Sequence, residues 1–108
     1  MQAQVVRFHE TGGPDVLRLE TIDIDDPGEG QVLLRQTACG LNFLDTYQRS
    51  GAYPMALPAV AGNEAAGVVE QVGPGVTSLA VGDRVAYAGG DPGSYASHRI
   101  FPADRVVK

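Results

Sequence analysis

The stretch LPAVAGNEAAGVVEQVG, residues 57–73, is the segment of the sequence that says most about the fold. Gly62 and Gly67 bracket a segment of small residues that carries a single carboxylate, Glu64. A glycine permits backbone angles and close approaches that a Cβ atom would forbid. The valine-rich run over 68–72 is typical of a β-strand, and the Gly-Pro-Gly after it ends the strand.

Glu64 is followed by two alanines that cannot solvate its carboxylate. If the segment is buried, this carboxylate must be hydrogen-bonded or paired, because an unpaired buried charge is very costly. Two interpretations stay open. One is a glycine-kinked barrel strand in which Glu64 is satisfied locally, and the other is a functional site. The residues alone favour the first.

The composition bounds the class of protein. A chain of 108 residues forms one domain, and its 14 glycines and seven prolines fall between short apolar runs, as in a protein of short strands. The net charge of −5 argues against a nucleic-acid partner, which needs a basic face. No apolar run is long enough for a membrane span, and no signal pattern is present, so we expect a cytoplasmic protein with no membrane partner.

Alternating apolar residues and turn signals predict an all-β domain of about seven short strands with one short helix, a partly open barrel. Strands are expected within Gln2–Glu10, Val16–Ile24, Gln31–Cys39, residues 68–72, residues 76–87, Ser94–Phe101 and from Arg105 onward, with the first two forming a hairpin. Residues 52–58 are expected to be irregular, because each of their two prolines restricts the residue before it.

The helix is predicted to begin after Asn42 and to end at Gly51. Asn42 is a favoured N-cap residue, and Asp45 stands three positions later, as in a capping box. Phe43 and Tyr47 belong to its apolar side.

The sequence lacks the motifs that are typical of metal binding, of dinucleotide binding and of a nucleophilic cysteine. His9 and His98 stand at ligand spacing neither from each other nor from Cys39, so no metal site is predicted. The glycines never follow G-x-G-x-x-G, so this segment alone should not hold a dinucleotide. Cys39 has no nearby histidine to activate it and is predicted to be a small buried apolar group.

A cluster of polar and aromatic residues remains at the start of the helix and in the loop after it. Asn42, Asp45, Tyr47 and Tyr53, with Glu64 close behind, could orient a flat polar ligand. Alternatively, Asn42 and Asp45 only cap the helix while Tyr47 packs, and this second interpretation is favoured on the residues alone.

These segments resemble the quinone oxidoreductase branch of the medium-chain dehydrogenase/reductase superfamily. The resemblance rests on GLNFLDTYQRSGAYP (40–54) and GNEAAGVV (62–69), and it is extended by GPGV (73–76), VGDRV (81–85) and GGPDVL (12–17). It runs almost from end to end of the chain.

The resemblance implies that residues 1–108 form a GroES-like barrel, the catalytic domain of a two-domain NADPH-dependent reductase. A Rossmann domain that binds NADPH is expected after Lys108, so the chain is expected to be an N-terminal piece that is inactive alone. The full-length enzyme is expected to be a homodimer.

The resemblance also bears on metal chemistry. The zinc alcohol dehydrogenases carry a cysteine ligand where this chain has Asn42 and a histidine ligand where it has Asn63. An amide is a poor zinc ligand beside thiolate or imidazole. The expected reaction is therefore a zinc-independent transfer of hydride from NADPH to a quinone.

By similarity, the catalytic residues are expected to be Asn42, Asp45, Tyr47 and Tyr53. Asn42 and Asp45 would edge the nicotinamide and acceptor pocket, and the two tyrosines would line it with flat faces and hydroxyls. Cofactor contacts are expected from Asn42, Tyr47 and Glu64, with Glu64 a support rather than an acid.

Two other functions stay open. A zinc-free reductase of enals or enones would use the same cluster on an α,β-unsaturated carbonyl. A non-catalytic GroES-like binding module or co-chaperonin would need a mobile apolar loop, whereas the long stretch Gly89–Gly93 is rich in glycine and not apolar.

Overall fold

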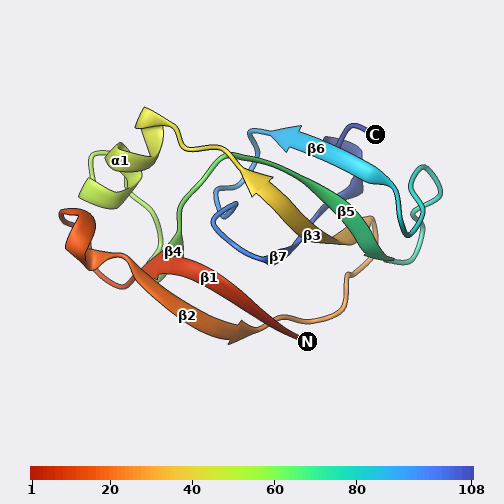
Figure 1. Cartoon of the computed structure of the whole chain (residues 1–108), viewed down its shortest axis with the longest axis horizontal. Coiled ribbons are helices and arrows are strands. Elements are labelled where there is room, and N and C mark those ends of the chain that lie inside the picture. Colours follow the sequence, from red (N-terminus) through yellow and green to blue (C-terminus); the bar gives the residue numbers. More distant parts are fainter.

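The computed structural model describes residues 1–108, and its strands form two antiparallel sheets that do not close into a complete barrel (Figure 1). The strands are β1 (Gln2–Phe8), β2 (Arg18–Asp23), β3 (Gln31–Cys39), β4 (Ala59–Val60), β5 (Glu64–Val72), β6 (Arg84–Ala88) and β7 (His98–Pro102). The smaller sheet has the order β2-β1-β4 and the larger one β6-β5-β3-β7. The helices are α1 (Phe43–Ser50) and the short 3-10 helices η1 (Pro14–Val16) and η2 (Ala103–Arg105). The predicted mainly-β, partly open architecture is confirmed.

The larger sheet carries most of the core. Its cluster comprises Val32, Leu34, Ala65, Val69, Leu79, Val85, Tyr87, Phe101 and Ala103. A second cluster of Phe8, Ala59 and Ala61 lies under the smaller sheet, where Tyr95 packs against it. A single backbone bridge, Val5 to Ala96, connects β1 to the segment before β7.

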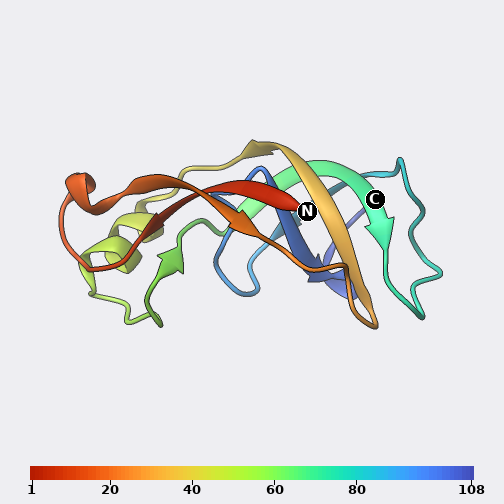
Figure 2. The ribbon, with the colours of Figure 1, turned by 90° about the horizontal axis from the view of Figure 1, so that it is seen from below.

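Strand β5 begins at Glu64, four residues before the predicted valine run. Ala65 and Ala66 pair with the end of β3. A Cβ atom on Gly67 would lie 2.2 Å from the backbone oxygen of Arg35, so glycine is what lets the two strands approach this closely. The register shifts twice along this pair, and Figure 2 shows that β3 and β5 are bowed, as bulges produce.

Three local expectations need correction. Cys39 is exposed at the end of β3 rather than buried, because the outer side of this strand end carries no covering element. Of the predicted strand over 94–101, only the part from His98 is a strand. After Pro102 the chain turns into η2, and only one bridge, Ala86 to Val107, represents the expected final strand.

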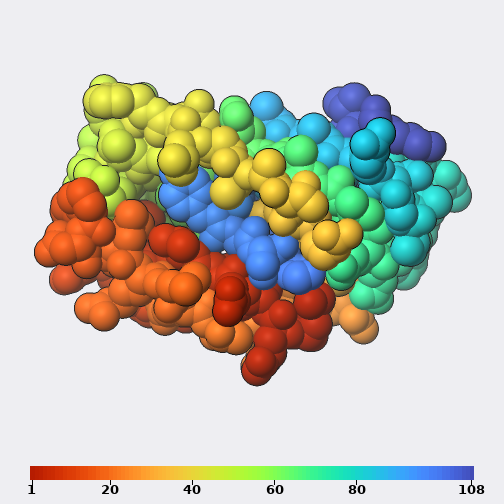
Figure 3. Space-filling model, in the orientation of Figure 1, coloured from red at the N-terminus to blue at the C-terminus, as the bar shows by residue number.

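Helix α1 and the turn between β1 and β2 lie at the same end of an elongated molecule (Figure 3). The contact is polar. The Gly12 N–H donates to the Arg49 carbonyl at 3.0 Å, and Arg49 Nε donates to the Gly12 carbonyl at 3.1 Å. The hairpin therefore fixes the far end of the helix. None of the helices is both long and apolar enough to cross a membrane.

Candidate functional site

Helix α1 begins with the predicted capping box. The Asn42 backbone N–H donates to Asp45 Oδ2 at 3.0 Å, and the Asp45 N–H donates to the Asn42 carbonyl at the same distance. Gly51 ends the helix with a φ of +91°, a left-handed conformation that glycine adopts without steric cost. The sequence therefore predicted both ends of this helix correctly.

Asp45 does more than cap the helix. Its side chain is buried, with the residue only 6% exposed. Oδ1 accepts a hydrogen bond from Asn63 Nδ2 at 2.8 Å, and Oδ2 accepts one from the Tyr95 hydroxyl at 2.6 Å. Together with the Asn42 backbone, these donors compensate a carboxylate that water does not reach. Each oxygen of Asp45 already has a protein partner.

Gln48 continues this network one turn along the helix. It is buried, and its Nε2 donates to Asn63 Oδ1 at 3.4 Å. We call Asp45, Gln48, Asn63 and Tyr95 the Asp45 network. Sequence reasoning missed Gln48, although its spacing of three residues from Asp45 on one helix is a signal that could have found it. Tyr95 lies 50 residues away and gives no local signal.

The predicted tyrosines come together on the outer side of the helix. Phe43, Tyr47 and Tyr53, which we call the aromatic patch, are 73%, 44% and 55% exposed. Their rings meet edge to face, with centroids 5.3 Å apart for Phe43 and Tyr47 and 5.8 Å apart for Tyr47 and Tyr53. The Tyr53 N–H donates to the Tyr47 carbonyl at 3.1 Å. Exposed aromatic groups held in this way are typical of a binding surface.

Glu64 lies apart from the Asp45 network. It is exposed, so water solvates its carboxylate and the question of a buried charge does not arise. Its side chain lies over Gly40, where an added Cβ would come 2.1 Å from Glu64 Oε1. It borders a shallow groove of about 590 Å³ that Ala65 and Tyr87 also line. The Glu64 carboxylate thus faces water beside Gly40 and is not part of the Asp45 network.

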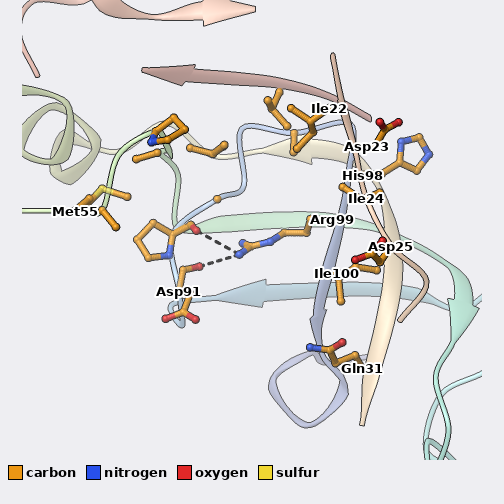
Figure 4. Close-up of a pocket in the computed structure, with 18 of the residues that line it drawn as sticks. Ile22, Asp23, Ile24, Asp25, Gln31, Met55, Asp91, His98, Arg99 and Ile100 are labelled. Carbon is orange, nitrogen blue, oxygen red and sulfur yellow. Dashed lines mark hydrogen bonds between the residues drawn. The ribbon is translucent and has the colours of Figure 1, made fainter. Parts of the chain in front are cut away.

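The largest cavity, of about 890 Å³, lies elsewhere, between the two sheets (Figure 4). Ile22, Ile24, Met55 and Ile100 contribute apolar walls, and acidic residues that include Asp23, Asp25 and Asp91 stand around it. None of the predicted site residues lines it. Arg99 also lines the cavity, but its guanidinium is bonded to the Asp91 and Pro92 carbonyls. The acids outnumber it and would repel the phosphates of a dinucleotide, so the cavity is a poor candidate for a cofactor site.

The side chains also do not suit zinc. No three His, Cys, Asp or Glu side chains gather where they could hold a metal ion. His9, just after β1, hydrogen-bonds Glu20, and His98 in β7 lies 3.5 Å from Glu70. At the two positions where the resemblance to zinc alcohol dehydrogenases would place ligands, this chain has Asn42 and Asn63, and Asn63 is bonded to Asp45.

Tyr87, which is buried, and Tyr95, which is partly buried, predict a loss of stability in alkali. Burial first, and then the hydrogen bond to Asp45, raise the pKa of Tyr95, and burial raises the pKa of Tyr87. A raised pKa in the folded state gives stability that is present below the unfolded value, about 10 for tyrosine, and is lost as pH rises above it. We expect urea midpoints to fall above about pH 10. Replacing both residues by phenylalanine should flatten this fall, whereas Tyr53→Phe should not. If the urea midpoint fell equally steeply with pH in the wild type, in the double variant and in Tyr53→Phe, the loss of stability would not come from Tyr87 and Tyr95.

Comparison with known proteins agrees with this fold. Residues 28–108 match the alcohol dehydrogenase GroES-like domain family. The chain is 48% identical to a 2-haloacrylate reductase of Burkholderia sp and 46% identical to a quinone oxidoreductase of Salmonella typhimurium, in each case over 94% of this chain and 32% of that protein. A crystal structure of Escherichia coli quinone oxidoreductase with NADPH superposes with a TM-score of 0.93, at 43% identity over 96% of this chain and 32% of that one.

The chain thus spans about a third of the length of these relatives. Both the matched family and the relatives agree with the predicted resemblance. The chain belongs to the alcohol dehydrogenase GroES-like domain family, in the quinone oxidoreductase branch of the medium-chain dehydrogenases/reductases.

Proposed function

We propose that this chain is the substrate-side domain of a zinc-independent NADPH:quinone oxidoreductase. The aromatic patch carries the proposal, because it places exposed flat rings beside the capped start of α1 in a domain similar to quinone oxidoreductases. Flat aromatic faces suit a quinone ring, and the phenol hydroxyls suit its oxygens. The remaining two thirds of the relatives' length would supply the dinucleotide-binding domain.

The residues fit one end of NADPH only. The rings of Tyr47 and Tyr53 and the exposed amide of Asn42 suit a flat, amide-bearing nicotinamide. The pyrophosphate finds no counterpart, because the chain is acidic and Arg49, the cation in α1, is bonded to the Gly12 carbonyl. We therefore expect this chain to contact the nicotinamide end of NADPH. By itself it should bind NADPH too weakly to support turnover.

When bound, NADPH supplies the hydride of the reaction. The task of this chain is to align the acceptor, and close, oriented contact accounts for much of the rate in such a reaction. The hydroxyls of Tyr47 and Tyr53 can donate to the two oxygens of a quinone. Asn42 can hold the ring edge through its side-chain Nδ2, because a capping box uses only its side-chain oxygen and its backbone N–H. Asp45 acts by holding this arrangement, since its oxygens are already bonded to protein groups.

A second function is favoured by one relative. The 2-haloacrylate reductase is 48% identical to this chain, and a haloacrylate is an α,β-unsaturated acid. The aromatic patch and Asn42 could equally orient such an acceptor, as they could the substrate of an enal or enone reductase. A co-chaperonin is less well supported, because the residues of Gly89–Gly93 are tied by the hydrogen bonds from Arg99 to Asp91 and Pro92.

A chimera with a complete relative tests the proposal. Replacing the matching third of Escherichia coli quinone oxidoreductase with residues 1–108 should give a protein that oxidises NADPH with 1,4-benzoquinone. The 108-residue chain alone should not. Turnover by the isolated chain would contradict the two-domain proposal, as would a folded chimera without activity. Faster reduction of 2-chloroacrylate than of the quinone would favour the second function.

Substitutions in the chimera test the roles of individual residues. We expect Tyr47→Phe and Asn42→Ala each to lower kcat/KM for 1,4-benzoquinone by about tenfold, the value of one lost hydrogen bond of about 1.4 kcal/mol. Tyr47 is exposed, so Tyr47→Phe should change the urea midpoint little, whereas Asn42→Ala also removes an N-cap side chain and should lower stability by about 1 kcal/mol. Thr46→Ser on the same helix serves as the control and should match the parent. If kcat/KM stayed unchanged, Tyr47 would serve only in packing and Asn42 only in capping the helix.

A further inference from the structure

Tyr95 connects Asp45 to the smaller sheet. Its hydroxyl donates to Asp45 Oδ2 at 2.6 Å. Its N–H donates to the Ala61 carbonyl at 3.0 Å, and its own carbonyl accepts from the Val6 N–H at 2.9 Å. Its ring packs against the cluster of the smaller sheet that contains Phe8. The position of Tyr95 is therefore fixed at its backbone, its ring and its hydroxyl.

A second set of polar side chains holds the segment that carries Tyr95. Gln36 Nε2 donates to the Ser94 carbonyl at 3.0 Å and to the Ala96 carbonyl at 2.8 Å, the carbonyls on either side of Tyr95. Gln36 Oε1 accepts from the Tyr87 hydroxyl, and Arg99 Nη1 donates to that hydroxyl at 3.2 Å. Figure 4 shows the same Arg99 hydrogen-bonded to the backbone carbonyl of Asp91. A chain of hydrogen bonds thus runs from this loop to the backbone on either side of Tyr95.

The Asp45 network also fixes which way the Asn63 amide points. An ionised carboxylate only accepts hydrogen bonds, so the atom of Asn63 that faces Asp45 must be Nδ2. The atom that faces Gln48 Nε2, a donor, must be Oδ1. One N–H and one lone pair of the Asn63 amide have no partner within the chain, and the residue is only partly buried. The network therefore presents an amide in one defined orientation.

We propose that Tyr95 is a positioning residue, which acts through the Asp45 carboxylate to fix both the Asn63 amide and the first turn of α1. That turn begins at Asn42, and Tyr47 of the aromatic patch lies one turn later. Removing the Tyr95 hydroxyl would leave Asp45 Oδ2 with only the Asn42 N–H, so the carboxylate could rotate and release Asn63. The consequence for catalysis rests on the proposed function, whereas the structural claim does not.

Nuclear magnetic resonance on the 108-residue chain tests the structural claim. Tyr95→Phe deletes one hydroxyl and keeps the ring. We expect the side-chain amide protons of Asn63 to exchange with water about tenfold faster, as the loss of one hydrogen bond predicts, and the amides of the first turn of α1 to shift. Thr37→Val is the control, because it deletes a hydroxyl that bonds the Ala66 carbonyl and takes no part in the hydrogen bonds of Asp45, Asn63 or Tyr95. It should leave the Asn63 side-chain signals in place.

The wild-type protein provides a second measurement in case the variant does not fold. A hydroxyl bonded at 2.6 Å to a buried carboxylate should give its own slowly exchanging proton resonance, with cross-peaks to the β-protons of Asp45. The absence of this resonance in wild type would overturn the proposal. A folded Tyr95→Phe variant with unchanged Asn63 and α1 signals would do the same.

The catalytic consequence is measured in the chimera. Because misplacement of aligned groups lowers the rate of the chemical step, Tyr95→Phe should lower kcat about tenfold while the KM for NADPH stays within about twofold. Thr37→Val should change both much less. An equal loss in both variants, or a change in KM alone, would contradict a positioning role. An inactive parent chimera would refute the proposed function, whereas the magnetic resonance comparison would still decide the role of Tyr95.

Discussion

Gly62→Ala is expected to remove about 4 kcal/mol or more from the free energy of unfolding, most of the stability of a small domain. A Cβ atom at this buried position would lie 2.1 Å from Ser94 Oγ and 2.6 Å from Cδ1 of Tyr95. The backbone φ of +103° adds strain for any residue with a side chain. The overlap cannot be relieved locally, because the Gly62 carbonyl accepts the Gly93 N–H at 2.9 Å.

Gly82→Ala is the matched control for this variant. Gly82 has a similar φ of +95°, but nothing lies within 4 Å of an added Cβ. Its substitution should cost only the conformational strain, about 1 kcal/mol. Urea unfolding monitored by circular dichroism measures both. Equal losses in the two variants would show that the contact with Ser94 and Tyr95 does not determine the need for glycine.

Asp45→Ala is expected to cost about 3 kcal/mol of stability and to release the start of helix α1. The substitution leaves the Asn63 amide, the Tyr95 hydroxyl and the Asn42 N–H without their acceptor. Each buried donor left unsatisfied is destabilising, and the helix also loses a cap. In the chimera the same variant should lose most of its quinone reductase activity.

Asp26→Ala provides the control for the change in charge. Asp26 is exposed beside the cavity between the sheets, so its loss should alter stability by no more than about 0.5 kcal/mol. The two variants have the same net charge and differ only in what the carboxylate contacts. If Asp45→Ala were as stable as Asp26→Ala, the Asp45 network would have no energetic role.

Local patterns in the sequence predicted the elements of this fold well. The capping pair of Asn42 and Asp45 and the glycine at 51 gave the bounds of α1. Alternation and turn residues gave the β1–β2 hairpin and strand β3. Gly62 and Gly67 were expected to permit backbone angles or close approaches that a Cβ would forbid, and the structure supplies the atoms that a Cβ would meet.

The parts that sequence reasoning missed depend on contacts between distant segments. Tyr95 reaches Asp45 across 50 residues, and Gln36 reaches the Ser94 and Ala96 carbonyls across 58 and 60. No spacing rule connects such residues. Cys39 was predicted to be buried because it ends an apolar strand, but its exposure depends on which elements cover the strand end. For Asp45, the spacing predicted the cap, whereas it could not predict the burial.

A chelator assay tests most directly the claim that this domain supports hydride transfer through aligned aromatic and amide groups without zinc. The reduction of 1,4-benzoquinone by the chimera would be measured with NADPH before and after prolonged exposure to 1,10-phenanthroline, beside the parent Escherichia coli enzyme. We predict the same rate in both conditions and no stoichiometric zinc by elemental analysis. A rate that falls with the chelator and returns on addition of zinc would contradict the account.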